Sequence, residues 1–95
     1  MLVSQDDLRA RFAAGDYVAR ALREEYHCCL RSERPCSIPT EPPNTRSLIL
    51  GFLKPNGPLV FLVHCYLRPD GTLGASGRLD LKYLVSDDGS HYYVS

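Results

Sequence analysis

The residues with the greatest capacity for chemistry gather between positions 64 and 82, in the stretch HCYLRPDGTLGASGRLDLK. There an apolar, strand-like sequence runs directly into a glycine-rich segment. Binding and catalytic groups concentrate on loops that a rigid scaffold holds in place. We therefore predict the recognition site in this segment, called the rim (residues 64–82) below. The predicted binding residues, which include one tyrosine from the end of the chain, are His64, Tyr66, Arg68, Ser76, Arg78, Lys82 and Tyr92.

The rim contains the groups that metal-independent RNA cleavage requires. In that reaction a base activates the 2′-hydroxyl, cations stabilise the phosphorane, and an acid protonates the leaving oxygen. The candidate catalytic residues are His64, Tyr66, Arg68, Arg78 and Lys82. His64 would be the acid or base, the cations would hold phosphate, and Tyr66 or His91 would be the second proton-transfer group. Small bacterial toxins with a helix-then-sheet layout use similar sets, which is an analogy of architecture without a shared motif.

A binding module is the competing class, and it is our leading interpretation. The outer face of the expected sheet would carry Leu53, Val60, Leu62 and Tyr66, joined by Tyr92 or Tyr93. Exposed apolar patches mark protein or dimer interfaces, and tyrosine and arginine are enriched at binding hot spots. Eleven basic residues balance eleven acidic ones, so no net field attracts nucleic acid. We therefore expect an adaptor or homodimer that binds a protein partner or itself. In the alternative interpretation the protein is a small metal-independent endoribonuclease, and its partner is RNA.

The same polar residues also have purely structural explanations. His64 could be an ordinary surface histidine. Arg68 could form a turn-flanking ion pair with Asp70, and Arg78 could do so with Asp80, each pair contributing at most about 1 kcal/mol. The glycine-rich run lacks both the glycine pattern of a serine hydrolase elbow and the lysine of a phosphate-binding loop. We reject those two classes.

Composition predicts one folded domain over residues 1–95, because hydrophobic residues make up 44% and charged residues 23% of the chain. Acidic and arginine residues interrupt the N-terminal segment where a signal peptide needs an apolar core. The longest apolar run is too short to span a bilayer, so we expect no membrane partner. The expected location is the cytoplasm, where cysteines stay reduced.

The four cysteines predict no metal site. Cys28 and Cys29 are adjacent, and Cys36 and Cys65 follow at spacings that match no paired-cysteine zinc motif. Adjacent residues on the helix expected there would point about 100° apart, which makes them poor joint ligands. We expect buried thiols, no metal and no cofactor.

The first third of the chain is predicted to be helical, over residues 4–31. Ser4 is a suitable N-cap, and Gly15 followed by Asp16 would end one helix and start the next. The second helix would run over residues 17–30. Its core stripe would be Val18, Leu22, Tyr26 and Cys29 or Leu30. A proline-rich connection over residues 32–46 would then lead to a β-rich half over residues 47–95.

The β-rich half is predicted to contain two hairpins. A type I′ turn at Asn56-Gly57 would place Phe52 opposite Phe61 and Ile49 opposite His64, with His64 on the face away from the core. Asp80 would cap one helical turn over residues 81–84, and Asp88-Gly89 would form the second hairpin turn. The expected fold is α+β, with two N-terminal helices packed on one face of a curled antiparallel sheet of three to five strands.

Overall fold

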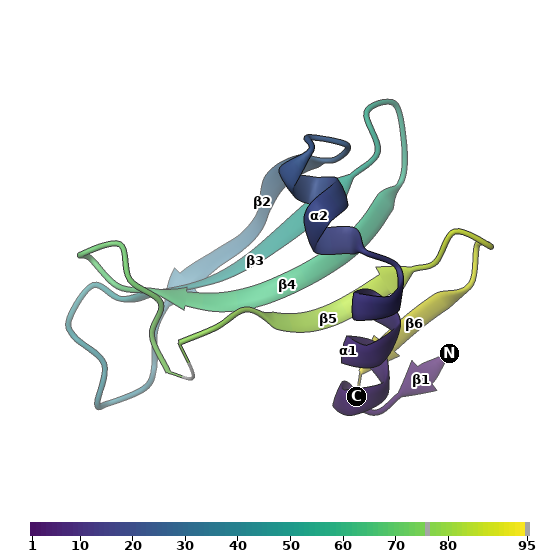
Figure 1. Ribbon diagram of the computed structural model, residues 1–95. Coiled ribbons are helices and arrows are strands. Elements are labelled where there is room, and N and C mark those ends of the chain that lie inside the picture. The colour runs from purple at the N-terminus through teal and green to yellow at the C-terminus, as the bar shows by residue number, and fades with distance from the viewer. Residues whose placement is uncertain (76, 95) are drawn as a thin grey trace.

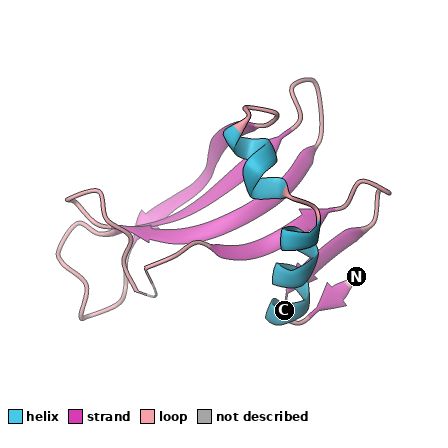
Figure 2. Ribbon diagram, in the orientation of Figure 1, coloured by secondary structure: helices cyan, strands magenta, loops and turns pink. Residues whose placement is uncertain are grey.

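The chain folds as an α+β domain of two short helices and one six-stranded mixed sheet (Figure 1 and Figure 2). The computed structural model describes residues 1–75 and 77–94. Its elements are β1 (Leu2–Val3), α1 (Gln5–Ala14), α2 (Tyr17–Leu22), β2 (His27–Pro35), β3 (Arg46–Leu53), β4 (Leu59–Leu67), β5 (Asp80–Val85) and β6 (His91–Val94). The strand order is β1-β6-β5-β4-β3-β2, with β1 parallel to β6 and all other neighbours antiparallel. The α+β class agrees with the prediction, but the sheet has six strands and is mixed, whereas an antiparallel sheet of three to five strands was expected.

Helix α1 follows the prediction. Ser4 caps it, with its hydroxyl oxygen accepting a hydrogen bond from the Asp7 N–H at 3.1 Å. Leu8 is fully buried against the sheet. The helix ends at Ala14, and Asp16 occupies the N-cap position of α2, as expected, although its side chain does not cap the helix. Asp16 has a left-handed φ of 58°.

The second predicted helix is wrong beyond Leu22. Residues 27–35, predicted to be helix and the start of the connection, form strand β2, which pairs with β3 along its whole length. Val18 and Leu22, which we placed in the core, are 58% and 80% exposed. Tyr17 is buried instead and stacks on Phe12 with 5.4 Å between ring centroids. The apolar spacing was compatible with a helix, but pairing with a distant strand overrode it.

The β3–β4 hairpin has the predicted register with a different turn. Phe52 pairs with Phe61 and Ile49 with His64, as expected. Neither Asn56 nor Gly57 has a positive φ, so the type I′ turn is wrong. The Gly57 N–H donates to the Lys54 carbonyl at 3.1 Å instead. Two prolines explain this turn. Pro55 fixes φ at the second position of the turn, and Pro58 favours an extended backbone at the preceding Gly57.

A bulge between Phe52 and Leu53 absorbs the changed turn and restores the expected pairing beyond it. Close to the turn the pairing differs, because Leu53 pairs with Leu59, whereas the type I′ turn would have placed it opposite Val60. Val60, expected on the outer face, is 4% exposed and belongs to the core.

The last part of the chain is a second antiparallel hairpin. The predicted helical turn at residues 81–84 is wrong, because Asp80–Val85 is strand β5 between β4 and β6. The predicted turn at Asp88-Gly89 is confirmed. Gly89 has a φ of 86°, and its N–H donates to the Ser86 carbonyl at 2.9 Å.

The core lies between the helices and the β4–β6 part of the sheet. Phe61 is its centre, and its ring contacts those of Phe12, Tyr17, Tyr26 and Phe52 at centroid distances of 4.4 to 6.1 Å. Helix α1 packs against β5 and β6. The β2–β4 strands extend well beyond both helices, so much of their helix-side face is left without a covering layer (Figure 1).

Candidate functional site

His64 lies on the sheet face opposite the helices, as predicted. Its Nε2 is 2.8 Å from the Ser47 hydroxyl oxygen on the neighbouring strand β3. Its ring meets that of Tyr66 edge to face, with centroids 4.7 Å apart. Burial lowers the pKa of His64, Lys82 lowers it further, and Asp80 opposes this shift. The structure therefore brings His64, Tyr66 and Lys82 to one region and favours the neutral imidazole.

Arg68 is held by a carboxylate that we did not predict. Its Nε and Nη2 donate to the two oxygens of Glu41, at 2.8 and 3.2 Å, and the Ala75 N–H donates to Glu41 Oε1 at 2.6 Å. We call this arrangement the Glu41 clamp. Hydrogen bonds from Arg68 and Ala75 keep the pKa of Glu41 below its ordinary value. The clamp joins the proline-rich connection to the rim, so Arg68 helps to hold these two segments together.

Neither ion pair that we offered as a structural explanation of the rim arginines forms among the described residues. Asp70 accepts hydrogen bonds from the Thr72 N–H and hydroxyl, at 2.9 and 2.6 Å, which stabilises the turn after β4. Asp80 pairs with Arg9 of α1, across 3.6 Å, and not with Arg78.

Apart from Lys82, which lies near His64, the remaining predicted site residues that the structure describes do not join that region. Lys82 is exposed on β5. Tyr92 is 8% exposed and belongs to the core, with the Arg11 guanidinium 4.2 Å from its ring centroid. Tyr93 is the exposed tyrosine of β6, at 46%. Ser76 lies outside the described residues.

His91, the alternative proton-transfer group, hydrogen bonds to the Tyr83 hydroxyl. Strand β5 separates its strand from that of His64. The partner of His91 on β5 is Val85 and that of His64 is Asp80, five residues away, so the two histidines are also offset by about 16 Å along the strands and do not converge on one reacting atom.

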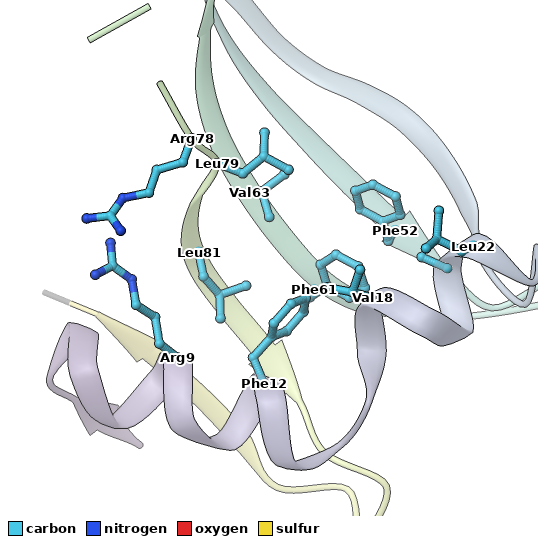
Figure 3. A pocket seen from close by; sticks show the side chains of 11 residues that line it. Arg9, Phe12, Val18, Leu22, Phe52, Phe61, Val63, Arg78, Leu79 and Leu81 are labelled. Atoms are coloured by element: carbon cyan, nitrogen blue, oxygen red, sulfur yellow. The ribbon is translucent and has the colours of Figure 1, made fainter. Parts of the chain in front are cut away.

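An apolar groove lies between the helices and the sheet, and we did not predict it. It has a volume of about 650 Å³. Figure 3 shows its lining, which is Arg9, Phe12, Val18, Ala21, Leu22, Phe52, Phe61, Val63, Arg78, Leu79 and Leu81. We call this the groove. Such a volume is typical of ligand-binding clefts.

Arg78 belongs to the groove and not to the surroundings of His64. Val63 lines the groove, and the next residue on its strand, His64, faces the other side of the sheet. In Figure 3 the side chains of Arg78 and Arg9 point toward one another at one end of the groove, and both line it. Of the rim, residues 78, 79 and 81 contribute to the groove lining.

One feature of the sequence could have indicated the groove. Helix α2 has only six residues and leaves its apolar side chains exposed. Val18 and Leu22 are one helical turn apart and share a face of α2, which we assigned to the core. Together with Leu79, which is 47% exposed, they form the edges of the groove.

The described part of the chain contains neither a metal-binding cluster nor a helix that could span a membrane. Within residues 1–75 and 77–94, no cluster of three or more histidine, cysteine, aspartate or glutamate side chains is placed to hold a metal ion. The four cysteines are free thiols. Cys65 is buried as expected, whereas Cys28 is exposed and Cys29 and Cys36 are half-buried, contrary to the expectation. None of the described helices is long and apolar enough to cross a bilayer.

Comparison of the chain with protein-family models, curated proteins and solved structures gave no match.

Proposed function

We propose that this protein is a protein-interaction module and that the groove is its docking surface. The observation that carries the proposal is the exposure of the groove's apolar edges. Leu22 is 80%, Val18 58% and Leu79 47% exposed, beside an aromatic floor. Contiguous exposed apolar surface of this kind marks interaction sites. The rim takes part through Arg78 and Leu79, which line the groove.

The ribonuclease alternative has less support. Its catalytic groups must converge on one phosphate. Arg78 lies in the groove, whereas His64 faces the other side of the sheet. Arg68 is engaged by Glu41. His64 and Lys82 remain together, which leaves one cation beside one imidazole.

The proposed location is the cytoplasm. All four cysteines are free thiols, a state that the cytoplasm maintains.

Site-directed photo-crosslinking in the cells that naturally make the chain tests the proposed function. A benzophenone amino acid would replace Leu22 at the groove edge or, as the control, the exposed Arg34 on β2. We expect a discrete adduct with another protein from position 22 and not from position 34. An adduct of twice the mass of the chain would mean that the partner is a second copy. Indistinguishable adduct patterns from both positions would contradict the proposal.

Expression in bacteria separates the two functional classes. Growth arrest that His64→Ala relieves would favour the ribonuclease, because a docking surface in the groove does not involve His64. We expect no arrest.

A further inference from the structure

We infer that the occupant of the groove is an amphipathic α-helix of the partner protein, which places apolar side chains on the groove floor and an acidic side chain at Arg9 and Arg78. The inference rests on the proposed function and names the chemistry of the partner.

The backbone of the groove favours a helix over an extended segment. The sheet residues of its floor lie on β3, β4 and β5, and each of these strands is paired on both sides. An extended peptide would find no free strand edge there, and its own peptide groups would be desolvated without partners, at a considerable cost. A helix satisfies its peptide groups internally and presents only side chains.

The edges of the groove favour an occupant wider than a single acyl chain. Leu22 of α2 and Leu79 before β5 are both largely exposed, and the floor residues Phe52 and Phe61 lie between the helices and the sheet (Figure 3). A helix with its side chains is about 10 Å across, so it can contact the floor and shield the edges together. An acyl chain on the floor would leave Leu22 in water.

The charge at one end of the groove favours an acidic side chain on the partner. Arg9 and Arg78 direct their guanidinium groups toward the same space (Figure 3). Asp80 lies 3.6 Å from Arg9 and is half-buried, whereas Arg78 makes no ion pair with the described carboxylates. A carboxylate from the partner would balance the remaining positive charge and make bidentate hydrogen bonds. Because the arginines lie at one end, they would also fix the direction of the bound helix.

A second copy fits this end of the groove less well. The described residues that line the groove include two arginines and no acidic side chain. Two copies docked groove to groove would therefore supply cations and apolar groups, without the carboxylate that the arginines require.

A display library of helical peptides provides the test. Eight surface positions on an alanine-rich helical scaffold would be randomised, and binders would be selected on the whole protein. We expect enriched peptides with apolar residues at positions i, i+3 or i+4, and i+7, and with Asp or Glu at one end. Selection on the Arg78→Glu variant should replace the acidic residue with Lys or Arg. Selection on Arg34→Glu, a charge reversal outside the groove, should reproduce the wild-type pattern.

Binding of one enriched peptide, synthesised with a fluorescent label, would quantify the result. We expect Arg78→Glu to weaken binding about tenfold or more, and Leu22→Asp to weaken it at least as much. Leu67→Asp, at an exposed apolar position that does not line the groove, should bind as wild type does. Thermal melting of each variant would confirm that it folds.

Three outcomes would overturn the inference. Enrichment without helical periodicity, or no enrichment, would exclude a helix as occupant; a position-22 adduct from a partner protein would then show that the interaction function itself survives. Saturable binding of a fluorescent fatty carboxylate that Leu22→Asp abolishes, with no helical peptide enriched, would assign the groove to a small amphiphile. Dimerisation in sedimentation experiments that Leu22→Asp abolishes would assign the groove to a second copy.

Discussion

Gly74 is the position where one added methyl group should report on the Glu41 clamp. A Cβ atom there would lie 2.8 Å from Glu41 Oε1 and 2.9 Å from its Cδ. Real Cβ contacts essentially never fall below 3.0 Å, so the carboxylate must move in Gly74→Ala. Arg68 and Ala75 hold that carboxylate through three hydrogen bonds, at 2.6 to 3.2 Å. The movement must therefore stretch or break at least one of them.

The expected loss for Gly74→Ala is that of an overpacked site, about 1–3 kcal/mol in the free energy of unfolding. Each kcal/mol corresponds to a fall of roughly 4–8 °C in Tm for a domain of this size. Urea unfolding followed by far-UV circular dichroism measures the loss. Gly57→Ala is the matched control, because a Cβ there meets nothing within 4 Å and φ is not positive. It should leave stability unchanged or raise it by about 0.4–1 kcal/mol.

A double variant tests the stated cause. Once Glu41→Ala has removed the carboxylate, adding Gly74→Ala should cost almost nothing further, because contacting residues are energetically coupled. If Gly74→Ala were as costly in the Glu41→Ala background as in the wild type, the collision with the carboxylate would not be the reason. A destabilising Gly57→Ala would likewise contradict the turn described here.

Three further predictions concern the core and pH. Leu8→Ala should lower the free energy of unfolding by about 2–5 kcal/mol, whereas Leu22→Ala should change it by less than about 0.5 kcal/mol; equal losses in urea unfolding would contradict the surface position of Leu22. Tyr26→Phe should keep or raise stability, by about 1 kcal/mol, because the buried Tyr26 hydroxyl has no hydrogen-bond partner among the described residues; a clear loss would reveal one. The pKa of His64 is lowered in the folded protein. Its contribution to the free energy of unfolding is therefore complete above the ordinary histidine pKa of about 6.5 and is lost as the pH falls through the folded-state value. Urea unfolding should therefore show a stability loss between neutral and mildly acidic pH that is smaller in His64→Gln; parallel profiles would contradict this.

The sheet register was the most predictable part of the fold. Apolar residues alternate along both strands of the β3–β4 hairpin, and a slip by one residue would turn Phe52 and Phe61 out of the core. This burial determined the register even though the turn was assigned wrongly. The turn itself depended on Pro55 and Pro58, whose restrictions outweigh the preference of Asn-Gly for a type I′ turn.

Strand β2 was not predictable from local spacing. Its residues match a helical stripe equally well, and their state is decided by pairing with β3, which follows ten residues after β2 ends. The Glu41 clamp was missed for the same reason. Asp70 is close to Arg68 in sequence, whereas Glu41 is 27 residues away and reaches it only in the folded chain. The groove depends on where a short helix sits over a curved sheet, so it also needed the structure.

The parallel pairing of β1 with β6 has a consequence for the order of folding. Leu2 pairs with Tyr93, and the Met1 amino group donates to the His91 carbonyl at 2.6 Å. The β3–β4 and β5–β6 hairpins close short loops, whereas this pairing must bring together residues almost the whole chain apart, which is entropically more costly and slower. During synthesis β1 leaves the ribosome before β6, so Leu2 remains unpaired until β6 has emerged. We expect α1, which is tethered directly behind β1 and seals Leu8 into the core, to dock in the same late step.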